Sequence, residues 1–144
     1  MSKRKNVLFL CTGNSARSIL GEAIFNSLFA SHGYAFSAGS RPVGQVNPFA
    51  LEALKNHGYD TRGFQSKNVG LFSSEDAPVM DLVISVCDSA AQDCPVWLGK
   101  GQPQRLHWPL PDPAALEDAA EKAAAFEKTY NDLKEKITAL VSTF

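Results

Sequence analysis

The stretch VLFL, residues 7–10, is the feature that most constrains the fold. Each of its residues is apolar, the loop CTGNSA follows it, and apolar residues then recur at helical spacing between residues 18 and 29. A strand without polar alternation needs cover on both faces, which is typical of a parallel sheet. The succession of strand, loop and helix therefore predicts the first unit of an α/β fold, with the loop at the carboxyl end of the strand.

Further segments repeat this pattern along the chain. Three further segments are predicted to be strands: residues 34–40, 81–87 and 104–108. A loop with a short helix is predicted for residues 60–80. Residues 47–58 read as a helix with Asn47 as its cap, Pro48 at its first position and Gly58 at its end. The last helix is expected to begin at Pro113; its apolar face comprises Phe126, Tyr130, Leu133, Ile137, Leu140 and Val141.

These segments predict an α/β protein with a four-stranded parallel sheet and helices on both faces. The 144 residues contain no repeat and no linker, so we expect a single domain spanning residues 1–144. Strands that alternate with helices place ligand sites beyond their carboxyl ends. Cys11 and Cys87 both fall at such ends, so the sequence predicts a site that includes these thiols.

The composition excludes several classes of partner. Fourteen basic and 15 acidic residues give a net charge of −1, so no basic surface for a nucleic acid is expected. No apolar run approaches the ~20 residues that span a bilayer, which argues against a membrane protein. The odd set of cysteines, Cys11, Cys87 and Cys94, argues against a secreted disulfide framework. We therefore expect a cytoplasmic protein in which thiols serve catalysis or redox chemistry.

The loop CTGNSARS joins Cys11 to an arginine six positions later. Successive backbone N–H groups in a loop that turns into a helix can point at one centre, and the helix dipole adds to their field. A tetrahedral oxyanion fits such a centre, and Arg17 can bind it through a planar, two-pronged guanidinium. The predicted oxyanion-binding residues are Thr12, Gly13, Asn14, Ser15, Ala16, Arg17 and Ser18.

The same field favours a thiolate at Cys11 and makes it a candidate nucleophile. Ser18 can donate a hydrogen bond to that thiolate, and Gly13 and Asn14 are residue types that tolerate unusual backbone angles. The alternative is a buried structural cysteine followed by an arginine that plays no part in catalysis.

The motifs CTGNSARS, SAGS, NP, VCDSAAQDCP and HWPLPDPA occur in this order and cover nearly the whole chain. The chain thus resembles the low-molecular-weight tyrosine phosphatases and the arsenate reductases built on the same three-layer fold. The resemblance implies that Asp112 is the general acid, whereas the residues alone explain it as the cap of the last helix. Ala16 stands where many reductases have a cysteine. Ala114 replaces the aromatic residue usual in the phosphatases, which favours the reductases.

Cys87 and Cys94 leave three interpretations open. In the first, Cys87 is a packed core residue and Cys94 is incidental. In the second, the two cysteines and His107 bind zinc, although a fourth ligand is missing. In the third, the two cysteines form a thiol relay. The resemblance implies the relay, with thioredoxin, or else glutaredoxin or another small thiol, as reductant. The rivals are a phosphatase acting through a phosphocysteine and a redox sensor without turnover. We expect no metal and no organic cofactor.

One departure from the family concerns a potassium ion. Some related reductases bind this ion near the loop through an aspartate, an asparagine, a glutamate and a serine. Asn14, Glu22 and Ser37 match that set, but Lys67 stands in place of the aspartate. The resemblance therefore implies that the Lys67 ammonium takes the place of the cation; otherwise Lys67 is a solvated surface residue.

Overall fold

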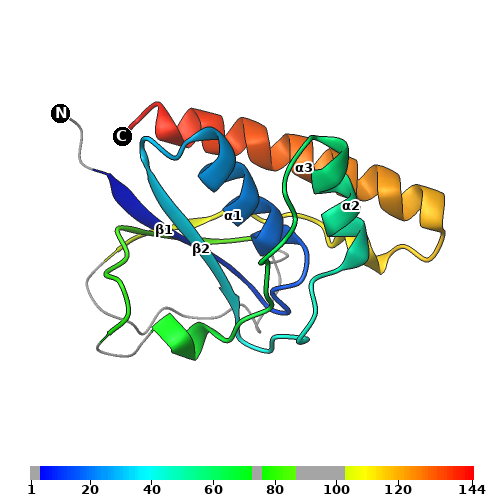
Figure 1. Ribbon diagram of the computed structural model, residues 1–144, viewed down its shortest axis with the longest axis horizontal. Coiled ribbons are helices and arrows are strands. Elements are labelled where there is room, and N and C mark those ends of the chain that lie inside the picture. Colours follow the sequence, from blue (N-terminus) through cyan, green and yellow to red (C-terminus); the bar gives the residue numbers. More distant parts are fainter. Residues whose placement is uncertain (1–3, 73–75, 87–102) are drawn as a thin grey trace.

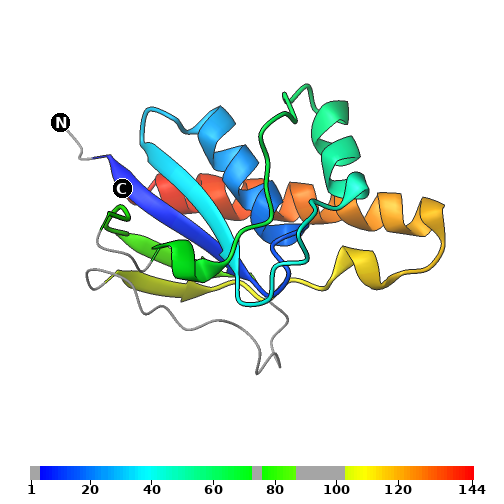
Figure 2. The ribbon, with the colours of Figure 1, turned by 60° about the horizontal axis from the view of Figure 1, so that its bottom comes forward.

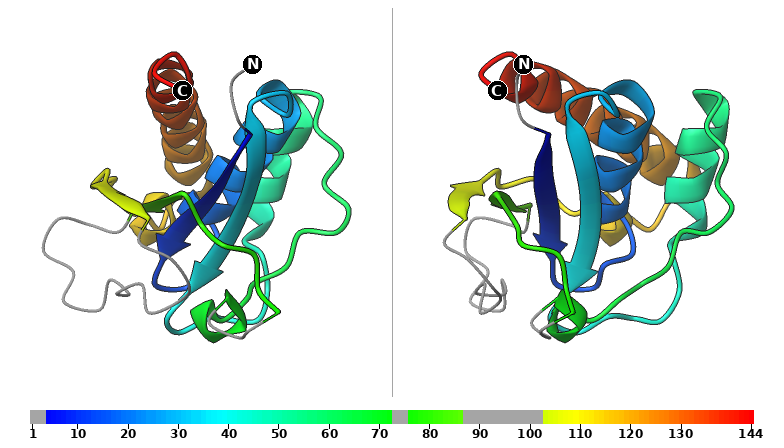
Figure 3. Two further views of the ribbon diagram at one scale, coloured as in Figure 1. Left: turned by 90° about the vertical axis from the view of Figure 1, so that its left-hand side faces the viewer. Right: turned by 60° about the vertical axis from the view of Figure 1, so that its left-hand side comes forward.

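The computed structural model describes residues 4–72, 76–86 and 103–144 (Figure 1). Its strands are β1 (Lys5–Cys11), β2 (Gly33–Gly39), β3 (Leu82–Ser85) and β4 (Gln104–His107). They form one four-stranded parallel sheet in the order β2-β1-β3-β4. The arrowheads of β1 and β2 point to the same end of the sheet in Figure 3. The predicted α/β fold with four parallel strands is confirmed.

Helices of different kinds cover the two faces of the sheet. The α-helices are α1 (Arg17–Leu28), α2 (Pro48–Asn56) and α3 (Ala119–Val141), and all three contribute to the larger apolar core. The short 3₁₀ helix η1 (Val69–Phe72) packs against the smaller core on the other face. Figure 2 shows α1 and α3 on the side of the sheet opposite η1.

Strand β1 is the centre of both cores because its side chains alternate between the faces. Val7 and Phe9 face the α-helices, whereas Leu8 and Leu10 face the side covered by η1. Val7, Leu8 and Phe9 are fully buried, and Leu10 is 1% exposed. This alternation is the period of two that a strand imposes, and it explains why the segment had to be apolar at every position.

The predicted caps of α2 are confirmed. The side chain of Asn47 accepts a hydrogen bond from the backbone N–H of Phe49 at 2.9 Å, and Pro48 is the first helical residue. Gly58 follows the helix with a φ of +86°, the left-handed angle that glycine adopts without steric cost.

The expectation that the last helix begins at Pro113 is wrong. Pro113 starts η2 (Pro113–Ala115), a single 3₁₀ turn, and the chain is extended again at Leu116 with a ψ of 146°. Helix α3 begins six residues later than expected, at Ala119, because Asp118 caps it by accepting from the N–H of Glu121 at 2.9 Å. Two aspartate caps in succession thus divide the segment.

Gly21 lies where α1 crosses β1, and its lack of a side chain sets their close approach. A Cβ at this position would lie 2.7 Å from the ring of Phe9, which is fully buried. We expect Gly21→Ala to lower the free energy of unfolding by about 1–3 kcal/mol, because the buried ring has to move. Urea denaturation measures the change.

The exposed Ser27 on the same helix provides the matched control. Ser27→Ala should change the free energy of unfolding by no more than about 0.5 kcal/mol. Equal effects of the two substitutions would show that the contact with Phe9 does not limit how α1 packs.

Candidate active site

Cys11 is the last residue of β1, and Arg17 is the first residue of α1. The loop of residues 12–16, which we call the oxyanion loop, connects them at the carboxyl end of the sheet. Cys11 is a free cysteine and only 3% exposed. The position predicted from the sequence, at the junction of a buried strand and a helix, is confirmed.

Backbone hydrogen bonds fix the direction of the peptide groups in the oxyanion loop. Three of its carbonyl groups accept from residues 41–47: Thr12 from the N–H of Arg41 (2.9 Å), Gly13 from Val43 (3.1 Å) and Ser15 from Asn47 (2.8 Å). A trans peptide holds its N–H antiparallel to its C=O. The N–H groups of these three peptides therefore point away from residues 41–47. Several amides that face one side form the kind of concavity that binds an anion.

Asn14 has a left-handed backbone conformation and connects the oxyanion loop to its neighbours through its side chain. It has a φ of +47° and is fully buried, whereas Gly13 needs no positive φ. Its side-chain oxygen accepts from the backbone N–H of Lys67 at 2.6 Å, and its side-chain nitrogen donates to the hydroxyl of Ser18 at 2.8 Å. An asparagine tolerates the left-handed angle because its short polar side chain can form such local bonds.

The direction of these bonds determines what the buried hydroxyl of Ser18 can do. A backbone N–H only donates, so Lys67 fixes which end of the Asn14 amide is the oxygen. The amide nitrogen then donates to Ser18, whose own O–H is left to donate elsewhere. This orientation is compatible with the predicted hydrogen bond from Ser18 to a Cys11 thiolate.

Arg17 and Asp112 are connected through the segment between β4 and η2. One terminal nitrogen of the Arg17 guanidinium donates to the carbonyl oxygen of Leu110 at 2.9 Å. Asp112, two residues further on, accepts from the N–H of Ala114 at 3.0 Å and so caps η2. The predicted capping role of Asp112 is confirmed, although the helix it caps is η2. Its role as general acid remains a prediction.

The Lys67 ammonium lies beside Ser37 and Glu22, two of the residues that match the potassium ligands of related reductases. This ammonium is 3.5 Å from the hydroxyl of Ser37 and 3.7 Å from a carboxylate oxygen of Glu22, and it donates to the carbonyl of Gln65 at 2.9 Å. Ser37 also donates to Glu22 at 3.2 Å. Burial raises the pKa of the Glu22 carboxyl, and the neighbouring positive charge of Lys67 opposes that rise. Lys67 is 21% exposed at its side chain and is not a solvated surface residue.

Cys87 and Cys94 lie outside the described residues. Strand β3 ends at Ser85, whose hydroxyl is 2.6 Å from the Nδ1 of His107 on the neighbouring strand. Across residues 4–72, 76–86 and 103–144, no group of three or more His, Cys, Asp or Glu side chains is arranged to hold a metal ion. In the same ranges, no helix has the length and apolar character needed to cross a membrane.

Sequence reasoning missed the residues that orient the loop from outside. The donors at residues 41–47 are backbone N–H groups and the acceptor at Leu110 is a backbone carbonyl. Nearly every residue type carries these groups, so no residue pattern could have identified them. The only available signal was the position of the SAGS and NP motifs on either side of residues 41–46.

Two substitutions of Asn14 separate its backbone role from its side-chain role. Asn14→Ala loses both side-chain bonds and keeps a Cβ in the left-handed region, so we expect a loss of about 3 kcal/mol in the free energy of unfolding. Asn14→Gly loses the same bonds without the steric cost, and should be more stable than the alanine variant by about 1 kcal/mol. Urea denaturation of both proteins checks the order, and an alanine variant at least as stable as the glycine variant would contradict it.

Known proteins similar to this chain include several arsenate reductases. A relative, the arsenate reductase of Halalkalibacterium halodurans, is 33% identical over 141 residues, which cover 97% of each chain. A solved arsenate reductase in the phosphate binding state has a TM-score of 0.78 and 27% identity, with 96% of this chain and 98% of that chain covered. A thioredoxin-dependent arsenate reductase of Corynebacterium glutamicum has a TM-score of 0.68 and 25% identity, over 99% of this chain and 65% of that one.

The match to a family extends over nearly the whole sequence. Residues 6–144 match the family described as low molecular weight phosphotyrosine protein phosphatase. The low-molecular-weight phosphatase-like fold expected from the resemblance is thereby confirmed. With this match, and with a relative as similar as that of H. halodurans, the chain belongs to the low-molecular-weight phosphotyrosine protein phosphatase family.

Proposed function

We propose that this protein reduces arsenate to arsenite at the oxyanion loop, with thioredoxin as the reductant. The observation that carries the proposal is the position of Cys11, at the start of a loop whose carbonyls at Thr12, Gly13 and Ser15 accept hydrogen bonds from residues 41–47. Support also comes from similar proteins, since the relative of H. halodurans is an arsenate reductase and the similar enzyme of C. glutamicum is thioredoxin-dependent.

In the first step the Cys11 thiolate attacks arsenic. The loop amides and the Arg17 guanidinium hold the arsenate oxygens, and Asp112 donates a proton to the oxygen that departs as water. One sulfur–arsenic bond forms and one arsenic–oxygen bond breaks, so arsenic remains As(V). The carbonyl of Leu110 supports this step because it holds Arg17 next to the segment that carries Asp112.

In the second step two thiols supply the electrons. The Cys87 thiolate attacks the sulfur of Cys11, and the electron pair of the sulfur–arsenic bond leaves with arsenic as arsenite, which is As(III). Cys94 then attacks Cys87, which frees Cys11 and leaves a Cys87–Cys94 disulfide. A dithiol of thioredoxin, or else glutaredoxin or a small thiol, reduces that disulfide. Such chemistry needs a reducing compartment, so we propose a cytoplasmic location.

A second candidate function is hydrolysis of phosphate monoesters through a phosphocysteine. The match to the phosphotyrosine phosphatase family over residues 6–144 favours it. This reaction needs Cys11, Arg17 and Asp112 but neither of the other two cysteines. The two functions therefore differ in what they require of Cys87 and Cys94.

The relay predicts which substitutions abolish turnover. Arsenate-dependent oxidation of NADPH, coupled through thioredoxin and thioredoxin reductase, should occur with the wild type and fall to background in Cys87→Ser and Cys94→Ser. Each serine keeps the shape of the side chain but cannot form a disulfide. Binding of phosphate, measured by calorimetry, should remain in both variants, because neither residue belongs to the oxyanion loop.

The same three proteins distinguish the rivals. If none oxidises NADPH and all cleave p-nitrophenyl phosphate equally well, the protein is a phosphatase and the relay is wrong. If Cys94→Ser still turns over with glutathione and glutaredoxin, the reductase is retained but its last step is different.

We also propose that the enzyme requires no potassium ion. The oxygens of Ser37 and Glu22 already face the Lys67 ammonium, so the residues present do not fit a further cation between them. Turnover should be the same in potassium chloride as in sodium chloride at equal ionic strength. Lys67→Ala removes the ammonium but keeps the backbone N–H that binds Asn14, so this variant should gain a response to potassium. Severalfold stimulation of the wild type by potassium would contradict the proposal.

A further inference from the structure

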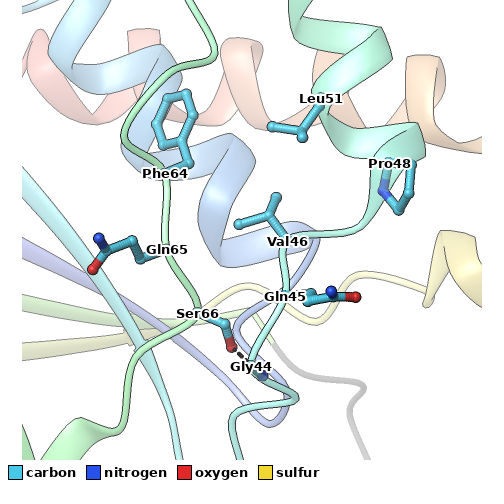
Figure 4. Close-up of a pocket in the computed structure, with 8 residues that line it drawn as sticks. All are labelled: Gly44, Gln45, Val46, Pro48, Leu51, Phe64, Gln65 and Ser66. Carbon is cyan, nitrogen blue, oxygen red and sulfur yellow. Dashed lines mark hydrogen bonds between the residues drawn. The ribbon is translucent and has the colours of Figure 1, made fainter.

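The hydroxyl of Ser66 joins three segments that are distant in the sequence. It donates to the carbonyl oxygen of Gly13 in the oxyanion loop at 3.0 Å and accepts from the backbone N–H of Gly44 at 3.2 Å. Figure 4 shows this hydroxyl directed toward Gly44 from the neighbouring segment. One side chain, half-buried, thus links residues 65–67 to both the oxyanion loop and residues 41–47.

The peptide between Gly13 and Asn14 is consequently held at both of its residues. Its carbonyl accepts a hydrogen bond from the hydroxyl of Ser66 and another from the backbone N–H of Val43. The residue after Ser66, Lys67, donates its backbone N–H to the side-chain oxygen of Asn14. Because the carbonyl and the N–H of one peptide are antiparallel, fixing the carbonyl of Gly13 also fixes the direction of the Asn14 N–H.

The surroundings of Ser66 allow its side chain to be enlarged. Ser66 lines a cavity of about 590 Å³, together with Val46, Leu51 and Phe64 (Figure 4). Because Ser66 borders this space, we expect a methyl group added to its side chain to be accommodated. A threonine can keep the hydroxyl bond, whereas a valine of the same shape cannot form it.

We propose that Ser66 is a positioning residue for the oxyanion site. It does not touch the anion; it orients the peptide between Gly13 and Asn14 before the anion arrives, and so sets the affinity of the loop for tetrahedral oxyanions. This inference rests on the oxyanion site of the proposed function and is independent of what happens to arsenate after binding.

Three variants test the role: Ser66→Ala, Ser66→Val and Ser66→Thr. The probe is inorganic phosphate, whose Kd is measured by calorimetry at a temperature at which every variant is folded. We expect Ser66→Ala and Ser66→Val to bind phosphate about tenfold more weakly, the equivalent of about 1.4 kcal/mol. Ser66→Thr should stay within about twofold of the wild type because it retains the donor.

Kinetics separate positioning from a general loss of structure. In the coupled assay, KM for arsenate should rise in parallel with the phosphate Kd while kcat changes little, because Ser66 acts on the loop before any bond forms. Ser142→Ala is the matched control, since Ser142 also donates to a backbone carbonyl, that of Ala139, at the end of α3. Whatever its effect on stability, this control should keep the phosphate affinity of the wild type.

Two outcomes would overturn the inference. One is an unchanged phosphate Kd in both Ser66→Ala and Ser66→Val; the other is a loss of affinity in Ser66→Thr equal to that in Ser66→Val. If Ser66→Ala does not fold, the phosphate Kd values of Ser66→Val and Ser66→Thr are sufficient to test the role of the hydroxyl. A wild type that binds phosphate but never reduces arsenate would defeat the proposed function and leave the role of Ser66 testable by affinity.

Discussion

The direction of the peptide groups in the oxyanion loop is the constraint on which the rest of the site depends. Residues 41–47 provide hydrogen-bond donors to the backbone carbonyls of Thr12, Gly13 and Ser15, which are partly buried. The amides are thereby free to face the opposite side. Strand β1 and helix α1 determine where the loop begins and ends, and the missing side chain of Gly21 allows these two elements to approach closely. This framework places Cys11 at the end of β1, directly before the loop.

The affinity for an oxyanion that we propose has a local origin. The whole chain has a net charge of −1, so no long-range positive field draws anions to the site. In the proposed function Arg17 and the loop amides provide the attraction, and the Leu110 carbonyl accepts a hydrogen bond from the Arg17 guanidinium. Lys67 contributes little net charge because Glu22 lies 3.7 Å from it. Its backbone N–H, which fixes the amide of Asn14, matters more for the loop.

Much of the fold could be predicted from the sequence because local signals agreed with the tertiary structure. The buried strand β1 follows from its continuous apolar run. The cap of α2 and the positive φ in the oxyanion loop each follow from one asparagine, Asn47 and Asn14. The start of α3 could not be predicted as readily. Asp112 and Asp118 both precede residues suited to a helix start, and both are caps in the structure. Residue type alone does not tell which of the two aspartates caps the long helix, and in the structure Asp112 caps only the short η2. The backbone donors and Ser66 lay equally beyond reach, since neither has a distinctive residue type.

A single turnover without any reductant tests the central claim most directly. The fully reduced protein is mixed with excess arsenate, and both the arsenite formed and the free thiols remaining are counted per chain. We expect one arsenite per chain and the loss of two of the three thiols, because formation of a disulfide supplies both electrons. No arsenite and three intact thiols, together with retained phosphate binding, would contradict it and leave an oxyanion-binding phosphatase site.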